Sequence, residues 1–125
     1  MPGSSRVLVV DDDIDFAQSL AAVLEEAGHE VRVACSASEG LRFLNVFVPD
    51  VAIADIRMPI VDGYALLAIL RADPKLGACK FIAISGDRVE EGRAASEFDA
   101  FFTKPVEMGR LIDAVQERGT ARELH

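Results

Sequence analysis

The chain has 125 residues, half of them hydrophobic, and a mean hydropathy of +0.22, which favours one compact domain with a real core over disorder. Its 13 basic and 21 acidic side chains give a formal charge of −8, which repels nucleic-acid phosphates and anionic membrane surfaces. No apolar run approaches the roughly 20 residues of a bilayer span, and the N-terminus has no signal-peptide pattern. We therefore expect a cytoplasmic protein that binds neither nucleic acid nor membrane directly.

The chain alternates between short β-rich runs and helical patterns from end to end. Continuous apolar runs are typical of strands covered on both faces, and apolar residues spaced by three and four are typical of helices. We expect five strands, at 7–10, 31–34, 51–54, 81–84 and 100–103. Helices are expected between them: from the N-cap Asp13 to the stop Gly28, after the capping box Ser36-x-x-Glu39, at 63–72, and, more weakly, at 89–97. A last helix should face inward with Met108, Leu111, Ile112 and Val115. Residues 119–125 are expected to form a tail or linker stub after a single domain with its core at about 6–118.

This order of elements predicts an α/β fold, in which a parallel sheet carries helices on both faces. Right-handed crossovers make a doubly wound sheet the simplest topology. In such sheets ligands bind at the carboxyl ends of the strands, near the point where the strand order reverses. The carboxyl edge is therefore where the chemistry is expected.

The two cysteines, Cys35 and Cys79, have no C-x-x-C spacing and no histidines clustered around them. In a reducing compartment we expect free thiols, buried or half-buried, in place of a disulfide or a metal site.

Polar residues follow four of the five predicted strands. Asp11 and Asp12 follow the first, Asp55 the third, Ser85 the fourth and Lys104 the fifth. Each alone has an ordinary explanation, because acidic residues favour helix N-termini, Ser-Gly favours turns and a lysine is usually solvated. Their joint placement at the ligand-binding edge instead predicts a pocket with three carboxylates, a hydroxyl and an ammonium.

The chemistry of such a pocket points to phosphoryl transfer. Clustered carboxylates repel one another unless a cation neutralises them, and Mg²⁺ suits an oxygen-rich site that also receives phosphate oxygens. A lysine complements phosphate as a point charge, and a carboxylate can act as the nucleophile. Phosphoryl transfer requires little beyond such positioning and neutralisation.

At this point the sequence resembles the receiver domain of bacterial response regulators over about residues 6–118. The resemblance is carried by Val9-Val10-Asp11-Asp12, by the stretch Asp55-Ile56-Arg57-Met58-Pro59-Ile60-Val61-Asp62-Gly63, by Ile84-Ser85-Gly86 and by Lys104-Pro105. It implies a five-stranded flavodoxin-like fold with strand order 2-1-3-4-5. It also implies a regulatory phosphoacceptor of a two-component phosphorelay, not an enzyme with turnover on a separate substrate.

The resemblance assigns a role to each matched residue. Asp55 would accept the phosphoryl group. Mg²⁺, or Mn²⁺ in its place, would be held by Asp55, directly by Asp12, through water by Asp11, and by the backbone carbonyl of Arg57. Ser85 and Lys104 would contact the phosphoryl group.

Phe101 falls at the family's aromatic switch position, and phosphorylation would change the face built from the fourth helix, the fifth strand and the last helix. Two residues depart from the commoner pattern. Ser85 replaces threonine and loses the methyl group that restricts its rotamer, and Phe101 replaces tyrosine and offers no phenolic hydroxyl.

The implied partners are a sensor histidine kinase or a histidine phosphotransfer protein, an unknown output partner or domain, and a second copy of the chain if phosphorylation drives dimerisation. The chain would be a single-domain regulator or the receiver of a longer protein, such as a hybrid kinase.

We also expect the side chains of Arg57 and Asp87, which lie two positions beyond Asp55 and Ser85, to pair across the mouth of the pocket. Such a gate would obstruct the attack of water on the phosphoryl group and so slow the loss of phosphate.

Two other readings remain open. Asp11-x-Asp13 is similar to the motif of haloacid-dehalogenase-type phosphatases, which also use an aspartyl nucleophile after a strand. A pseudo-receiver, which binds partners without ever taking phosphate, is the second alternative.

Overall fold

A five-stranded parallel sheet with the order β2-β1-β3-β4-β5 forms the centre of the molecule. The structure is a computed structural model in which residues 4–86 and 91–117 are described. Its strands are β1 (Arg6–Val10), β2 (Glu30–Ala34), β3 (Val51–Asp55), β4 (Lys80–Ser85) and β5 (Ala100–Thr103), and all four neighbouring pairs are parallel. The predicted fold class and strand order are confirmed.

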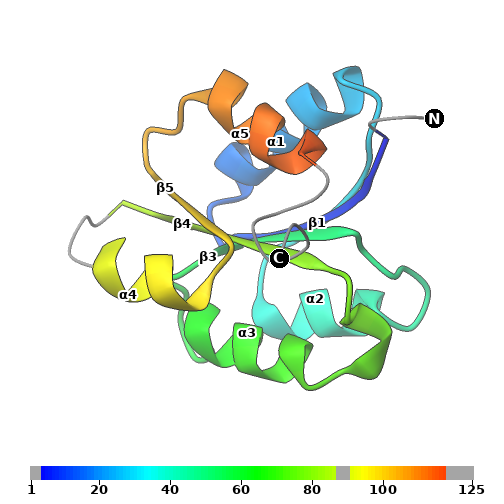
Figure 1. The fold of residues 1–125 in the computed structure, drawn as a ribbon, viewed down its shortest axis with the longest axis vertical. Coiled ribbons are helices and arrows are strands. Elements are labelled where there is room, and N and C mark those ends of the chain that lie inside the picture. Colours follow the sequence, from blue (N-terminus) through cyan, green and yellow to red (C-terminus); the bar gives the residue numbers. More distant parts are fainter. Residues whose placement is uncertain (1–3, 87–90, 118–125) are drawn as a thin grey trace.

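Helices cover both faces of the sheet (Figure 1). On one face lie α1 (Ile14–Glu26) and α5 (Met108–Gln116), and on the other lie α2 (Ala37–Phe43), α3 (Gly63–Arg71) and α4 (Glu91–Glu97). The alternation of side chains along each strand produces two cores. On β1, for example, Val7 and Val9 belong to the core under α1 and α5, whereas Leu8 and Val10 belong to the other core.

The helix ends follow the chemistry read from the sequence. Asp13 caps α1 by accepting a hydrogen bond from the N–H of Phe16, and Gly28 follows the helix with φ of +101°, a conformation that glycine adopts without strain. Ser36 caps α2 by accepting from the N–H of Glu39, but the Glu39 carboxylate accepts from the N–H of Cys35 and not from that of Ser36. The expected capping box is therefore only half formed, with its return bond moved one residue upstream.

Three further expectations need correction or limitation. Cys79 is buried as expected, but Cys35 is exposed because it lies in the turn after β2, outside the apolar face of that strand. A short 3₁₀ helix, η1 (Pro74–Leu76), follows α3 and was not predicted. The helix expected at 89–97 is described only from Glu91 onward, and its first two residues lie outside the described residues.

Of the inward face expected for α5, Leu111 and Val115 are buried, and Met108 and Ile112 are half-buried. Within the described parts of the chain, none of the helices has the length and hydropathy required to cross a bilayer.

Candidate functional site

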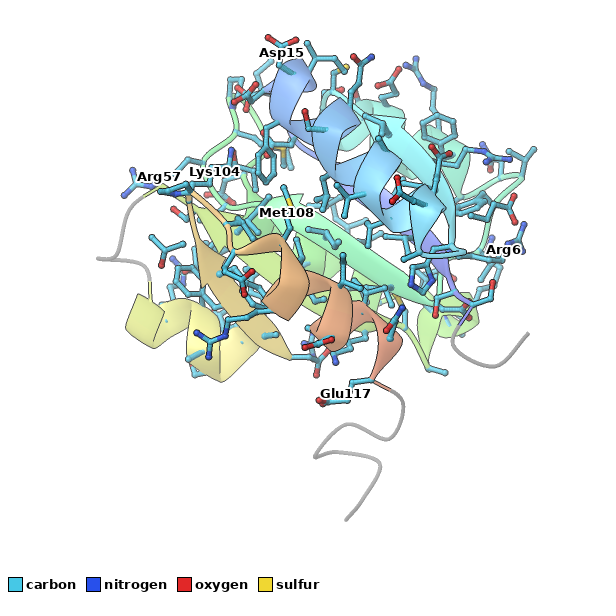
Figure 2. The ribbon with its side chains drawn as sticks, turned by 90° about the horizontal axis from the view of Figure 1, so that it is seen from above. Arg6, Asp15, Arg57, Lys104, Met108 and Glu117 are labelled. Carbon is cyan, nitrogen blue, oxygen red and sulfur yellow. The ribbon has the colours of Figure 1, made fainter. Side chains whose placement is uncertain are left out.

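The strand register brings the predicted polar residues to one edge of the sheet. Asp11 directly follows β1 and Asp55 ends β3, while Val10 and Ala54, the residues before them, are paired across the two strands. Ser85 ends β4, opposite Thr103 of β5, and Lys104 comes next. In Figure 2 the labelled side chains of Lys104 and Arg57 lie at one end of the molecule, whereas Arg6, at the start of β1, lies at the other.

Three carboxylates gather at this edge. Asp11, Asp12 and Asp55 each offer an oxygen, and these atoms lie within 4.8 Å of one another. Asp11 and Asp55 are buried and Asp12 is exposed, so the cluster opens to solvent on one side. Hard oxygen ligands at this spacing fit a divalent cation such as Mg²⁺, which retains several of its waters.

Burial makes the Asp11 carboxylate costly to ionise. Its side chain is fully buried, and its Oδ1 accepts a hydrogen bond of 2.9 Å from the N–H of Asp13. Burial is the largest influence on its pKa, and together with the nearby charge of Asp55 it raises that pKa from 3.8 to about 6, against the opposing effects of the Asp13 N–H and of Lys104. A buried carboxylate of this kind gains much from a bound cation.

Lys104 spans two of the carboxylates. Its Nζ lies 3.0 Å from Oδ2 of Asp11 and 3.3 Å from Oδ2 of Asp55. The Asp11 oxygen is not aligned for a hydrogen bond, so that contact is an ion pair. Burial alone would lower the pKa of Lys104, but the two carboxylates together outweigh it and raise that pKa. The ammonium is therefore held in its charged form at the site.

A backbone hydrogen bond fixes the position of Lys104 at the end of β5. Its N–H donates to the carbonyl of Ser85 over 2.8 Å, which extends the pairing of β4 and β5 by one residue, and the following peptide bond, to Pro105, is cis. On its other side the ammonium lies 4.5 Å from the centre of the Phe16 ring in α1. No motif in the sequence singles out Phe16, which lies on the apolar stripe of its helix.

The loop between β3 and α3 is tied closely to Asp55. The Oδ1 atom of Asp55 accepts from the N–H of Arg57 over 2.9 Å, and the N–H of Gly63 donates to the carbonyl of Ile56. A Cβ atom on Gly63 would lie 2.8 Å from the Asp55 carbonyl oxygen and 2.8 Å from Cα of Ile56, so only glycine permits this approach. Within the loop, Ile60 is fully exposed and has φ of +70°, which is strained for a β-branched residue.

The remaining predicted residues lie on β4, on β5 and beyond. Ser85 is fully buried at the end of β4. Phe101 pairs with Ala83, is half-buried and packs against the core beneath α2, α3 and α4. The Arg57 side chain is exposed, and Asp87, its partner in the predicted gate, lies outside the described residues.

The sequence model of the response regulator receiver domain family matches residues 7–116. This chain belongs to that family. It is 39% identical over 114 residues to an uncharacterized 14.6 kDa protein of Leptolyngbya boryana, covering 89% of this chain and 87% of that protein. It is 38% identical to the transcriptional regulatory protein PrrA of Mycobacterium tuberculosis over 90% of this chain, and so spans about half, 49%, of PrrA.

The receiver domain is also similar to solved structures. The receiver domain of the Francisella response regulator 1452 superposes with a TM-score of 0.75 at 34% identity, covering 89% of this chain and 93% of that one. Membership of the family makes this chain a regulatory domain of a two-component system.

Proposed function

We propose that this receiver domain takes a phosphoryl group onto Asp55 in an Mg²⁺-dependent reaction. The observation that carries the proposal is the cluster of three carboxylates with oxygens within 4.8 Å, two of which are also contacted by the Lys104 ammonium. Phosphoryl transfer needs a nucleophile, neutralisation of charge and positioning, and this set of groups supplies all three.

The residues that would hold the cation are Asp11, Asp12 and Asp55, together with the backbone carbonyl of Arg57, and Mn²⁺ would serve in place of Mg²⁺. When bound, the ion would neutralise the carboxylates and the oxygens of the transferred group. Asp11 and Asp55 are presented by the ends of two paired strands, so the sheet sets their separation.

In the reaction a carboxylate oxygen of Asp55 attacks the phosphorus in line with the donor's leaving atom. A P–O bond to Asp55 forms, the donor's P–N bond, or P–O bond for an acyl phosphate, breaks, and the leaving group keeps the electron pair. The Lys104 ammonium and the Ser85 hydroxyl donate hydrogen bonds to the phosphoryl oxygens.

The donor would be a sensor histidine kinase or a histidine phosphotransfer protein. The chain does not supply one from its described residues, because His29 is buried and its Nδ1 accepts a 2.9 Å hydrogen bond from the N–H of Ser5. Ser5 precedes the first strand, so this histidine lies at the edge of the sheet opposite the carboxylates.

The output is a shift between two states of the domain. Ser85 would move toward the phosphoryl group, Phe101 would turn inward, and the face built from α4, β5 and α5 would change. That face would then meet an output domain, a separate partner or a second copy of the chain. Because the chain spans about half of PrrA, an attached output domain or a hybrid kinase is compatible with this role.

The contacts of Asp13 argue against a haloacid-dehalogenase-type phosphatase. That reading needs the Asp13 carboxylate in the active site, but Oδ1 of Asp13 accepts from the N–H of Phe16 as the cap of α1. Asp13 is also absent from the group of carboxylates that could share a cation.

The acceptor is tested with acetyl phosphate and Mg²⁺ by intact-mass analysis. Wild type should gain one phosphate that is lost in base, Asp55→Asn should gain none, and Asp113→Asn, a change at an exposed carboxylate of α5, should behave as wild type. An equal mass gain in wild type and Asp55→Asn would contradict the assignment. No gain in wild type, with any donor, would favour a pseudo-receiver.

A further inference from the structure

The contact between Phe16 and Lys104 joins helix α1 to the site. Phe16 is the third residue of α1, is half-buried, and packs against the core beneath α1 and α5. The Nζ atom of Lys104 lies over its ring, 4.5 Å from the centre. A cation within about 6 Å of an aromatic ring centre is attracted by the negative face of the ring.

Two further contacts of the ammonium are with groups that the reaction needs. Asp11, at 3.0 Å, is a candidate cation ligand, and Asp55, at 3.3 Å, is the proposed nucleophile. A divalent cation at the cluster would compete for both carboxylates and would also repel the ammonium. The two carboxylates would therefore hold Lys104 less firmly once a cation is bound.

The ring of Phe16 is a restraint of a different kind. It is uncharged, so it neither binds the cation nor reacts with phosphorus, and its position is fixed by the helix and by the core beneath it. The side chain of Lys104 is 21% exposed, so the ammonium is partly shielded from water, a condition that strengthens attraction to a ring.

We propose that Phe16 is a positioning residue for Lys104, whose ring keeps the ammonium beside Asp55 when the carboxylates become occupied. The proposal rests on the proposed phosphoacceptor function of Asp55. It predicts that the aromatic face matters and not merely the apolar volume, since leucine fills similar space without offering a negative face.

The test compares Phe16→Leu with Phe16→Tyr, which retains the ring. The rate of phosphorylation by acetyl phosphate with excess Mg²⁺ should fall two- to fivefold in Phe16→Leu, the equivalent of about 0.5–1 kcal/mol, and should remain near wild type in Phe16→Tyr. In a Lys104→Met background, Phe16→Leu should produce no further decrease, because its effect passes through the ammonium.

A second readout does not depend on activity. In NMR spectra of the Mg²⁺-loaded, unphosphorylated protein, the terminal methylene protons of Lys104 should be shifted upfield by the ring of Phe16. The shift should disappear in Phe16→Leu and persist in Phe16→Tyr. Urea unfolding of each variant identifies any general loss of stability, which would lower the rate equally with Lys104 and with Met at position 104.

The possible results distinguish failure of the positioning role of Phe16 from failure of the phosphoacceptor function of Asp55. If wild type takes phosphate on Asp55 but Phe16→Leu reacts at the same rate, or loses the same factor in the Lys104→Met background, the positioning role is wrong. If wild type takes no phosphate, the acceptor function fails, and the upfield shift alone decides whether the ring holds the ammonium in the loaded protein. An absent shift in wild type overturns the proposal in either case.

Discussion

Replacing Gly63 by alanine tests how closely α3 is packed against the acceptor strand. The added Cβ would lie 2.8 Å from the carbonyl oxygen of Asp55 and from Cα of Ile56, and both of these atoms belong to the backbone. Alanine gains up to about 1 kcal/mol over glycine within a helix, but overpacking of this kind costs about 1–3 kcal/mol. Because Gly63 is only the first residue of α3, we expect the gain to be small and the net loss of stability to be about 1–2 kcal/mol.

Urea unfolding of the metal-free protein measures this loss, and Gly92→Ala is the matched control. Gly92 also lies in the first turn of a helix, α4, but a Cβ atom there would meet nothing within 4 Å, so this variant should be unchanged or slightly more stable. Gly63→Ala should also slow phosphorylation, since relief of the clash must move the backbone that carries Asp55. A Gly63→Ala protein as stable as Gly92→Ala would refute the reasoning.

The other predictions concern the carboxylates and α5. Asp13→Ala should lose about 1 kcal/mol of stability with the helix cap and retain Mg²⁺ binding, whereas Asp12→Ala should lose Mg²⁺ binding; calorimetric titration that found the reverse would exchange their roles. The pKa of Asp11, raised from 3.8 to about 6, disfavours its ionised form in the folded metal-free protein, so this cost is fully present above pH 6 and is relieved as the pH falls toward 3.8. Mg²⁺ binding requires the ionised form, so affinity should fall about tenfold between pH 7 and 5, and equal affinity at both values would contradict the shift. Lys80→Met should remove the 2.7 Å hydrogen bond from the buried Lys80 ammonium to the carbonyl of Ala114, lower stability by about 2 kcal/mol and speed hydrogen exchange at the end of α5; unchanged exchange there would count against this anchoring.

Much of the fold could be predicted from the sequence, because each face of this sheet is covered. The fully buried strands β3 and β4 contain the unbroken apolar runs 51–54 and 81–84, and that signal is local. The half-formed capping box at Ser36 and the exposed side chain of Cys35 could not be predicted, because both depend on how the turn after β2 directs its side chains.

In the candidate site, too, some residues could be predicted from the sequence and some contacts could not. Asp11, Asp55 and Lys104 could be placed because they lie at strand ends, and a parallel sheet brings these ends to one edge regardless of side-chain conformation. The contact of Phe16 with Lys104 depends on the rotation of α1 about its axis and on the rotamer of a long side chain. The close approach of Gly63 to Asp55 depends on the path of the seven-residue connection between β3 and α3, residues 56–62. Neither leaves a periodic signal in the sequence.

Ile60 shows that one position can be constrained in its backbone and unconstrained in its side chain. Its left-handed conformation costs about 1–2 kcal/mol for a residue other than glycine, yet its fully exposed side chain contributes nothing to either core. A change to almost any polar or apolar residue would therefore leave the free energy of unfolding nearly unaltered, and a change to glycine would raise it. The surface beside the acceptor can thus diversify at this position at little cost in stability, whereas Gly63, three residues later, has no such freedom.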